Sequence, residues 1–196
     1  MTLVLDNLPL RSTTKNSWVD CAVKNFDEFL LDHAACERKA SALAMSFVAK
    51  YADRTALVEP MICLAKEELA HFHEVYRYIA KKGLQLAPDE KDPYLKLLLK
   101  KVRNGREEHF LDRLLVSGVV EARGCERFYL MGEHHPDSDY RRFYQRLARE
   151  EAGHHAIFTK LAKYYFENNV VEDRVDYWLD QEAKILEQLE IRPAVH

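Results

Sequence analysis

The chain has 196 residues, a length that suits one domain with a real hydrophobic core. Its net charge of −3 gives no overall signal for nucleic-acid binding, and no apolar run reaches membrane-spanning length. The four cysteines have no Cys-x-x-Cys spacing, and the N-terminus lacks the pattern of a targeting peptide. We therefore expect buried, reduced thiols in a cytoplasmic protein.

The sequence predicts an all-α protein, because no stretch alternates apolar and polar residues as a strand does. An irregular arm over about 1–16 should lead to a first long helix, with Ser17 as its N-cap, that runs to about Tyr51. The apolar residues of this helix, spaced by three and four, form a stripe that includes Glu37. A carboxylate on a core face is costly unless something neutralises it.

A short turn over 52–56 should return the chain as a second, antiparallel helix that ends near Lys82. Gly83 would cap that end, since glycine readily takes the left-handed conformation. The apolar stripe of this second helix contains two more polar residues, Glu68 and His71. Three residues apart, they lie on the same helical face, one turn from each other.

Residues 83–104 read as a long crossover connection. Asp92 is a plausible cap for a short helix over about Tyr94–Arg103. Ten extended residues and such a helix can span the length of a long helix. We therefore expect the segment to cross a four-helix bundle, so that the second and third long helices run parallel.

The third long helix is expected over about Arg106–His134, with Glu121 on its apolar stripe. Glu126 is a competitor for the same role, but it would lie about 7 Å from the level of the other polar residues at 1.5 Å of rise per residue. It also falls off the stripe, so we expect it to pair with Arg123 or Arg127.

A fourth helix should begin after a cap at Asp139 and run to about Tyr165. Its stripe carries the second Glu-x-x-His, formed by Glu151 and His154. A fifth helix over about Val171–Glu190 should pack outside the other four. The expected fold is a four-helix bundle of two antiparallel hairpins, joined by the crossover, with an extra C-terminal helix in a single domain.

The pattern Glu … Glu-x-x-His thus occurs twice, with 31 residues from Glu37 to Glu68 and 30 from Glu121 to Glu151. This is the ligand set of a dinuclear carboxylate metal site in a four-helix bundle. Four carboxylates at one level of a core need cations or protons to coexist. Carboxylate and imidazole ligands suit iron or manganese. The predicted metal ligands are Glu37, Glu68, His71, Glu121, Glu151 and His154.

Taken one at a time, these residues have ordinary explanations as salt-bridged or hydrogen-bonded core groups. His33, one turn before Glu37, reads as a core histidine beside the site rather than as a seventh ligand. A pair of irons held this way supports hydroxylation, desaturation, peroxide disposal or iron oxidation. The ligand set alone does not choose among these reactions.

The segments His33–Ala40, Lys66–Phe72, Glu121–Phe128 and Ala148–His155 resemble the bacterial tRNA isopentenyladenosine hydroxylases, the MiaE family. The resemblance covers nearly the whole chain and implies a ferritin-like, non-haem diiron monooxygenase. Its substrate would be 2-methylthio-N6-isopentenyl-adenosine beside the tRNA anticodon, whose isopentenyl group it would hydroxylate with dioxygen. It implies two iron ions as cofactor, tRNA and an unidentified electron donor as partners, and neither membrane nor DNA.

Two clusters of basic residues, in the crossover and at the start of the fourth helix, fit contacts to RNA phosphates. Without the resemblance, solvated surface faces would be the better explanation for both clusters. The candidate RNA-binding residues are Lys96, Lys100, Lys101, Arg103, Arg141, Arg142 and Arg146. The alternative function is a ferritin-like iron-oxidising or peroxide-reducing protein, including the manganese catalase type, with no RNA partner.

Overall fold

The structure is a computed structural model that describes residues 8–196. These residues form two compact units. One unit contains residues 21–90 and 193–195, and the other contains the described residues up to 20 together with 91–192 and 196. All regular secondary structure in this range is helical, which confirms the all-α prediction. No described helix has the length and hydropathy that crossing a membrane requires.

The first predicted helix is in fact two helices, α1 (Asn16–Lys24) and α2 (Phe26–Lys50). The expectation of one continuous helix was wrong at Asn25. Its side-chain amide donates a 2.9 Å hydrogen bond to the backbone carbonyl of Cys21, and its ψ of 47° leaves the helical range. An asparagine that bonds nearby backbone competes with the helical hydrogen-bond ladder.

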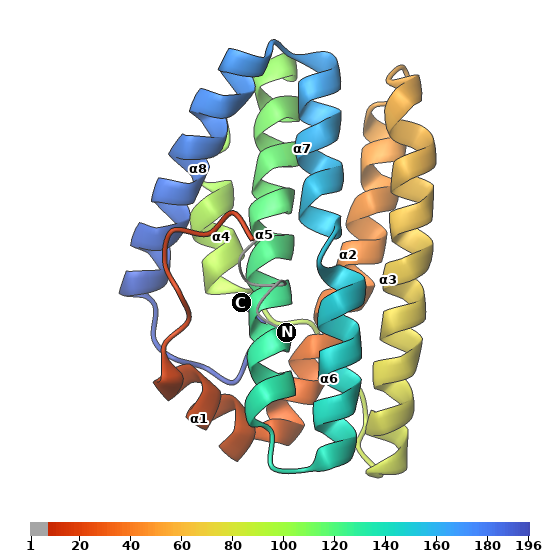
Figure 1. The fold of residues 1–196 in the computed structure, drawn as a ribbon. Coiled ribbons are helices and arrows are strands. Elements are labelled where there is room, and N and C mark those ends of the chain that lie inside the picture. The colour runs from red at the N-terminus through yellow and green to blue at the C-terminus, as the bar shows by residue number, and fades with distance from the viewer. Residues whose placement is uncertain (1–7) are drawn as a thin grey trace. The chain divides into compact units, whose positions relative to one another are not determined.

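In the first unit, α2 packs along α3 (Thr55–Lys81) as an antiparallel hairpin (Figure 1). Lys82, just past the end of α3, forms a 2.8 Å ion pair with Asp27 in the first turn of α2. Gly83 caps α3 with φ of 71°, while the Leu84 amide donates to the Ile79 carbonyl at 3.1 Å. This is the left-handed cap that the sequence predicts.

In the second unit, α5 (Arg106–His134) is central and packs against four other helices. Its bounds are those expected from the sequence. It contacts α4 (Pro93–Leu99), α6 (Ser138–Glu151), α7 (His154–Tyr165) and α8 (Asn168–Gln188). A helix covered on this many sides is buried around most of its circumference.

The fourth predicted helix is interrupted, which corrects a second expectation. Figure 1 shows α6 and α7 joined by a short non-helical step at Ala152 and Gly153. The N-cap of α6 is Asp137, whose carboxylate accepts the Asp139 amide at 2.7 Å, and not Asp139 itself. The extra C-terminal helix is present as α8.

The crossover contains the expected short helix, capped by Asp92, which accepts the Tyr94 amide at 2.8 Å. It ends at Leu99 and not at Arg103, because the Arg103 amide leaves the helix to donate to the Asp112 carboxylate at 2.9 Å. The parallel course of the second and third long helices and the single-domain organisation stay predictions.

The cysteines differ from the expectation of buried thiols. Cys125 is buried, but Cys63 is exposed and the other two are half-buried. All four are free thiols.

Candidate metal centre

The first candidate set lies within the α2–α3 hairpin. Glu37 is 3% exposed, Glu68 2% and His71 8%. Each of the three offers a ligand atom within 4.8 Å of the other two. The imidazole Nδ1 of His71 lies 3.7 Å from a carboxylate oxygen of Glu37. The structure therefore brings these three predicted residues together in a buried position.

Local structure explains this arrangement. Glu68 and His71 share one face of α3 because they are three residues apart on a continuous helix. Ser41 ties the two helices together by donating to the Ala65 carbonyl at 2.7 Å. His33 is fully buried, and its Nε2 lies 2.7 Å from a carboxylate oxygen of Glu37. A hydrogen bond of this kind orients a ligating carboxylate.

The second candidate set lies on α5, α6 and α7. Glu121, Glu151 and His154 again each offer a ligand atom within 4.8 Å of the other two. Glu151 and His154 are buried, and their Oε2 and Nδ1 atoms are 2.7 Å apart. Glu121 is half-buried, so it is the more accessible carboxylate of this set.

The helix break passes through this second set. Glu151 is the last residue of α6, and His154 is the first residue of α7. Gly118 lets α7 approach α5 closely, because a Cβ there would lie 3.1 Å from the His155 carbonyl oxygen. The positions of the two ligand candidates are thus fixed by packing on α5 and not by one continuous helix.

Cys125, one turn beyond Glu121, does not act as a thiolate. Burial, with the nearby Glu151 carboxylate as the second cause, raises the pKa of its thiol to about 12. The thiol donates to the Ala148 carbonyl at 3.3 Å. A protonated thiol is a poor metal ligand.

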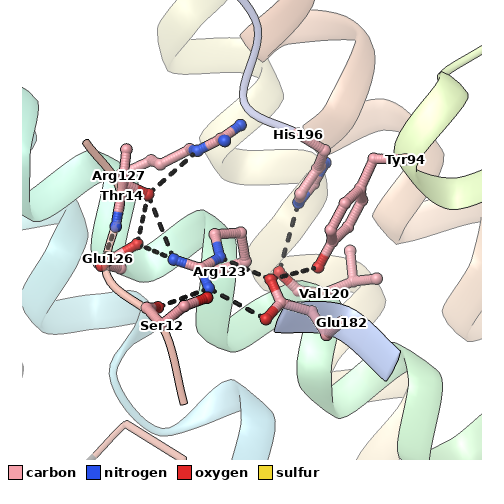
Figure 2. A network of polar contacts seen from close by, with 9 residues as sticks. All are labelled: Ser12, Thr14, Tyr94, Val120, Arg123, Glu126, Arg127, Glu182 and His196. Carbon is pink, nitrogen blue, oxygen red and sulfur yellow. Dashed lines mark hydrogen bonds and ion pairs between the residues drawn. The ribbon is translucent and has the colours of Figure 1, made fainter. Parts of the chain in front are cut away.

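Glu126 belongs to a different cluster from Glu121. It forms the expected ion pair with Arg123. It is only 4% exposed, so a residue off the stripe of Glu121 is nevertheless buried, on another face of α5. Its other carboxylate oxygen accepts the backbone amide of Thr14 at 2.9 Å (Figure 2). The N-terminal arm therefore covers a second buried face of α5.

Figure 2 shows that Arg123 is the hub of this network. Its Nε and Nη2 donate to the two carboxylate oxygens of Glu182 on α8, at 2.8 and 3.1 Å. The same guanidinium donates to the Ser12 carbonyl at 2.8 Å. Only the pairing of Glu126 with Arg123 was expected from the sequence, and the partners Glu182 and Ser12 were not. One signal in the sequence could have found this network. Arg123 and Glu126 are three residues apart on the third long helix, and the predicted fifth helix also has to pack against the outside of the bundle.

The candidate RNA-binding residues divide into two groups. The four arginines each have a polar partner within the chain, whereas Lys96, Lys100 and Lys101 are exposed and have no ion-pair partner among residues 8–196. Arg103 pairs with Asp112, Arg142 with Asp139 and Arg146 with Glu150, while Arg141 donates to the His135 and Pro136 carbonyls.

The donor chemistry of each three-residue set fits a metal ion. Each set supplies two carboxylates and one imidazole, mostly buried. Carboxylates buried side by side repel each other unless a cation or a proton neutralises them. Oxygen and imidazole donors in this mixture suit iron or manganese.

Comparisons with known proteins agree with this chemistry. A family model described as tRNA-(MS[2]IO[6]A)-hydroxylase (MiaE) matches residues 2–196. Two curated relatives both carry the name tRNA 2-(methylsulfanyl)-N(6)-isopentenyladenosine(37) hydroxylase. The one from Pseudomonas putida is 36% identical over 152 residues, or 78% of this chain and 74% of the relative. The one from Salmonella typhimurium is 26% identical over an alignment 226 positions long, which covers 90% of this chain and 83% of the relative.

A solved structure is also similar along most of the chain. It is described as Protein 43 with aldehyde deformylating oxygenase activity from Synechococcus. It is 35% identical to this chain, with a TM-score of 0.89, and the match covers 94% of this chain and 92% of that one. The fold of the chain is therefore ferritin-like and all-α. Since the family model spans all but the first residue, the chain belongs to the MiaE family of tRNA hydroxylases.

Proposed function

We propose that this chain is a metal-dependent tRNA hydroxylase. Its substrate is 2-methylthio-N6-isopentenyl-adenosine beside the anticodon, and it hydroxylates the isopentenyl group with dioxygen. The observation that carries the proposal is the match of the family model over residues 2–196. Two buried Glu-x-x-His sets add the chemistry that such a reaction needs.

The proposed metal ligands are the six residues of the two sets, which together hold two iron ions. The support is that each set has the same three donors and the same three-residue spacing from Glu to His. Bound iron supplies the activation of dioxygen, with electrons from a separate donor protein. An enzyme that acts on tRNA in this way would be cytoplasmic.

The chain's own residues have three tasks in this scheme. His33 fixes the orientation of Glu37 through their 2.7 Å contact. Buried apolar side chains such as Leu147 and Phe158 keep bulk water from Glu151 and His154. Half-buried Glu121 is the carboxylate with most room to move when substrate arrives.

RNA binding requires positive charge that phosphates can reach. Lys96, Lys100 and Lys101 meet this condition best because they are exposed. We propose that they contact tRNA first, while the four arginines contribute less because each already has a polar partner within the chain. The modified base must then leave the loop and enter a pocket, as enzymes that modify bases require.

The Synechococcus protein supports a second candidate function. Its described activity is that of an aldehyde deformylating oxygenase, and its identity to this chain, 35%, is close to the 36% of the Pseudomonas putida relative. Deformylation of an aldehyde by this chain would use the same donor sets. The two candidates differ in substrate and in the reaction that follows.

Nucleoside analysis of tRNA tests the proposal and separates the candidates. The gene is expressed in a strain that lacks its own hydroxylase but makes the unhydroxylated nucleoside. We expect the hydroxylated nucleoside to appear with the wild type and with Glu67→Gln, which changes an exposed neighbour on α3. It should be absent with Glu68→Gln. Unmodified tRNA with the wild type, together with loss of a supplied long-chain aldehyde, would favour the second candidate.

A further inference from the structure

A cavity of about 400 Å³ lies in the second unit, and none of its lining residues is a candidate metal ligand. It is lined by the N-terminal arm, one residue of α1, the start of α4, one residue of α5, and the end of α8 with the tail that follows. The α5 residue is Arg127, six positions after Glu121. Six residues correspond to about 240° of rotation, so the cavity faces another side of α5 than Glu121 does.

Arg127 places a buried cation in the wall of this cavity. The residue is 5% exposed, and its guanidinium lies 4.7 Å from the ring centre of Trp18. Its Nε is 3.5 Å from the hydroxyl oxygen of Thr14. Figure 2 shows the side chain reaching past Thr14, with its terminal nitrogens apart from the Arg123 group.

The surroundings make this cation receptive to an anion. Burial is the largest cause that lowers the pKa of Arg127 to about 10, and the neighbouring Arg123 cation is the second. The carboxylates of Glu126 and Glu182 raise this pKa in part, although both are ion-paired with Arg123. An anion in the cavity would offset the cost of burying the Arg127 charge.

The rest of the wall suits an apolar or aromatic body. Trp18 and Tyr94 line it together with Leu189 and Ile191. Burial raises the pKa of Tyr94 well above its usual value, so its hydroxyl stays neutral. Its ring stacks on His196, with centroids 5.5 Å apart. A mostly apolar cavity with one fixed charged group is the usual form of a small-molecule site.

The charges at the mouth favour a small anion over a polyanion. Lys15 and Arg192 are balanced there by the exposed Glu187 and Glu190. These two carboxylates would repel a nucleic-acid backbone, whereas a single charged group can pass to Arg127.

We propose that this cavity binds a small organic anion. Its carboxylate or phosphate contacts the Arg127 guanidinium, and its apolar body lies against Trp18 and Leu189. The guanidinium fork matches either headgroup. This site does not depend on the proposed tRNA reaction.

Calorimetric titration of the purified full chain tests the site with three small molecules that share a phenyl ring and differ in the attached group. Benzoate and phenyl phosphate carry the charge, and benzyl alcohol lacks it. We expect at least one of the two anions to bind about tenfold or more tightly than the alcohol. No binding of either anion at 10 mM, or equal binding of all three probes, would overturn the proposal.

Three variants locate the binding. Arg127→Met should weaken anion binding about tenfold or more. Ile191→Glu should do the same by adding a carboxylate at the exposed mouth, where folding is little affected. Lys184→Gln, an exposed residue of α8 outside the cavity, is the matched control and should bind like the wild type.

Unchanged affinity in Ile191→Glu, or in a folded Arg127→Met, would place the anion elsewhere. A further arm adds a short single-stranded RNA to the benzoate-bound protein. Failure of the RNA to displace benzoate supports a small-molecule site. Displacement would show instead that the cavity receives an RNA phosphate.

Discussion

The two Glu-x-x-His segments have the same spacing but different backbones. In the first unit, Glu68 and His71 lie in the middle of the continuous helix α3. In the second, Glu151 ends α6 and His154 begins α7, with Gly153 between them. The residue that corresponds to Gly153 in α3 is Ala70, a strong helix former. The repeat in the sequence is therefore not a repeat of local structure.

This difference shows when residue spacing alone brings the Glu and His side chains together and when helix packing is also needed. In α3, helical geometry alone puts the two side chains on one face. In α6 and α7, the same result needs packing on α5, where Gly118 allows the close approach of α7. The second set also has the half-buried Glu121, whereas all three residues of the first set are buried. We infer that the first set is the more rigid of the two.

The largest expected effect is on bound iron when either set loses a carboxylate. Glu68→Gln and Glu151→Gln should each reduce iron sharply below the wild-type content, because in the proposed assignment each removes a ligand of the two irons. Their exposed neighbours provide controls on the same helices, Glu67→Gln and Glu150→Gln. Elemental analysis of the purified proteins measures the result. Full iron retention in both ligand variants would refute the assignment.

The next largest effect separates two glutamates of α5. Glu121→Gln should lose iron and keep its stability. Glu126→Gln should keep iron but unfold more easily, by about 3 kcal/mol, because it leaves the buried Arg123 without one of its charged partners. Denaturant unfolding measures the stability of each variant, and elemental analysis measures its iron content. The reverse pattern would mean that Glu126 is the ligand.

The sequence predicts most helices well where both ends carry a local signal. The bounds of α5 agree because Gly105 precedes it and Pro136 follows it closely, and proline disfavours helix in the residue before it. The breaks at Asn25 and at Ala152–Gly153 were missed for a common reason. The apolar stripe continues through both breaks. Such a stripe shows the periodicity of the side chains, and it does not indicate a local change in the backbone.

The candidate metal residues were predictable because charged groups on an apolar stripe stand out. The Arg123 network and the cavity beside Arg127 were not predictable in that way. Both lie on a second buried face of α5, which α8 and the N-terminal arm cover. When the apolar stripe of one core face defines the inside of a helix, charged residues on a second buried face are taken for surface residues. Their spacing in the sequence is the same whether they are buried or exposed.

A smaller effect concerns RNA binding. Lys100→Gln with Lys101→Gln removes two exposed charges, so the slope of log affinity against log salt should fall by about two units. Arg142→Gln removes a charge already paired with Asp139 and should change the slope less. Titrations of tRNA at several salt concentrations compare the variants. Equal slopes in all of them would place the RNA elsewhere on the protein.

The smallest effect tests the break itself by exchanging corresponding residues. Gly153→Ala should stabilise the protein by about 0.5 kcal/mol, because a Cβ there meets nothing within 4 Å and φ is −97°. Ala70→Gly, at the exposed middle of α3, should destabilise it by about 1 kcal/mol. Thermal unfolding measures both. A destabilising Gly153→Ala would show that the step between α6 and α7 needs glycine.

The central claim is that the two sets hold one dinuclear centre, and magnetic measurement of the iron-loaded protein tests it most directly. Carboxylate-bridged ferric ions couple to a state without an electron paramagnetic resonance signal, while isolated ferric ions give a strong one. We predict two irons per chain, with Mössbauer spectra of a coupled pair and little resonance signal. Two irons per chain with the full signal of uncoupled ferric ions would contradict the claim, since each set would then bind its own metal.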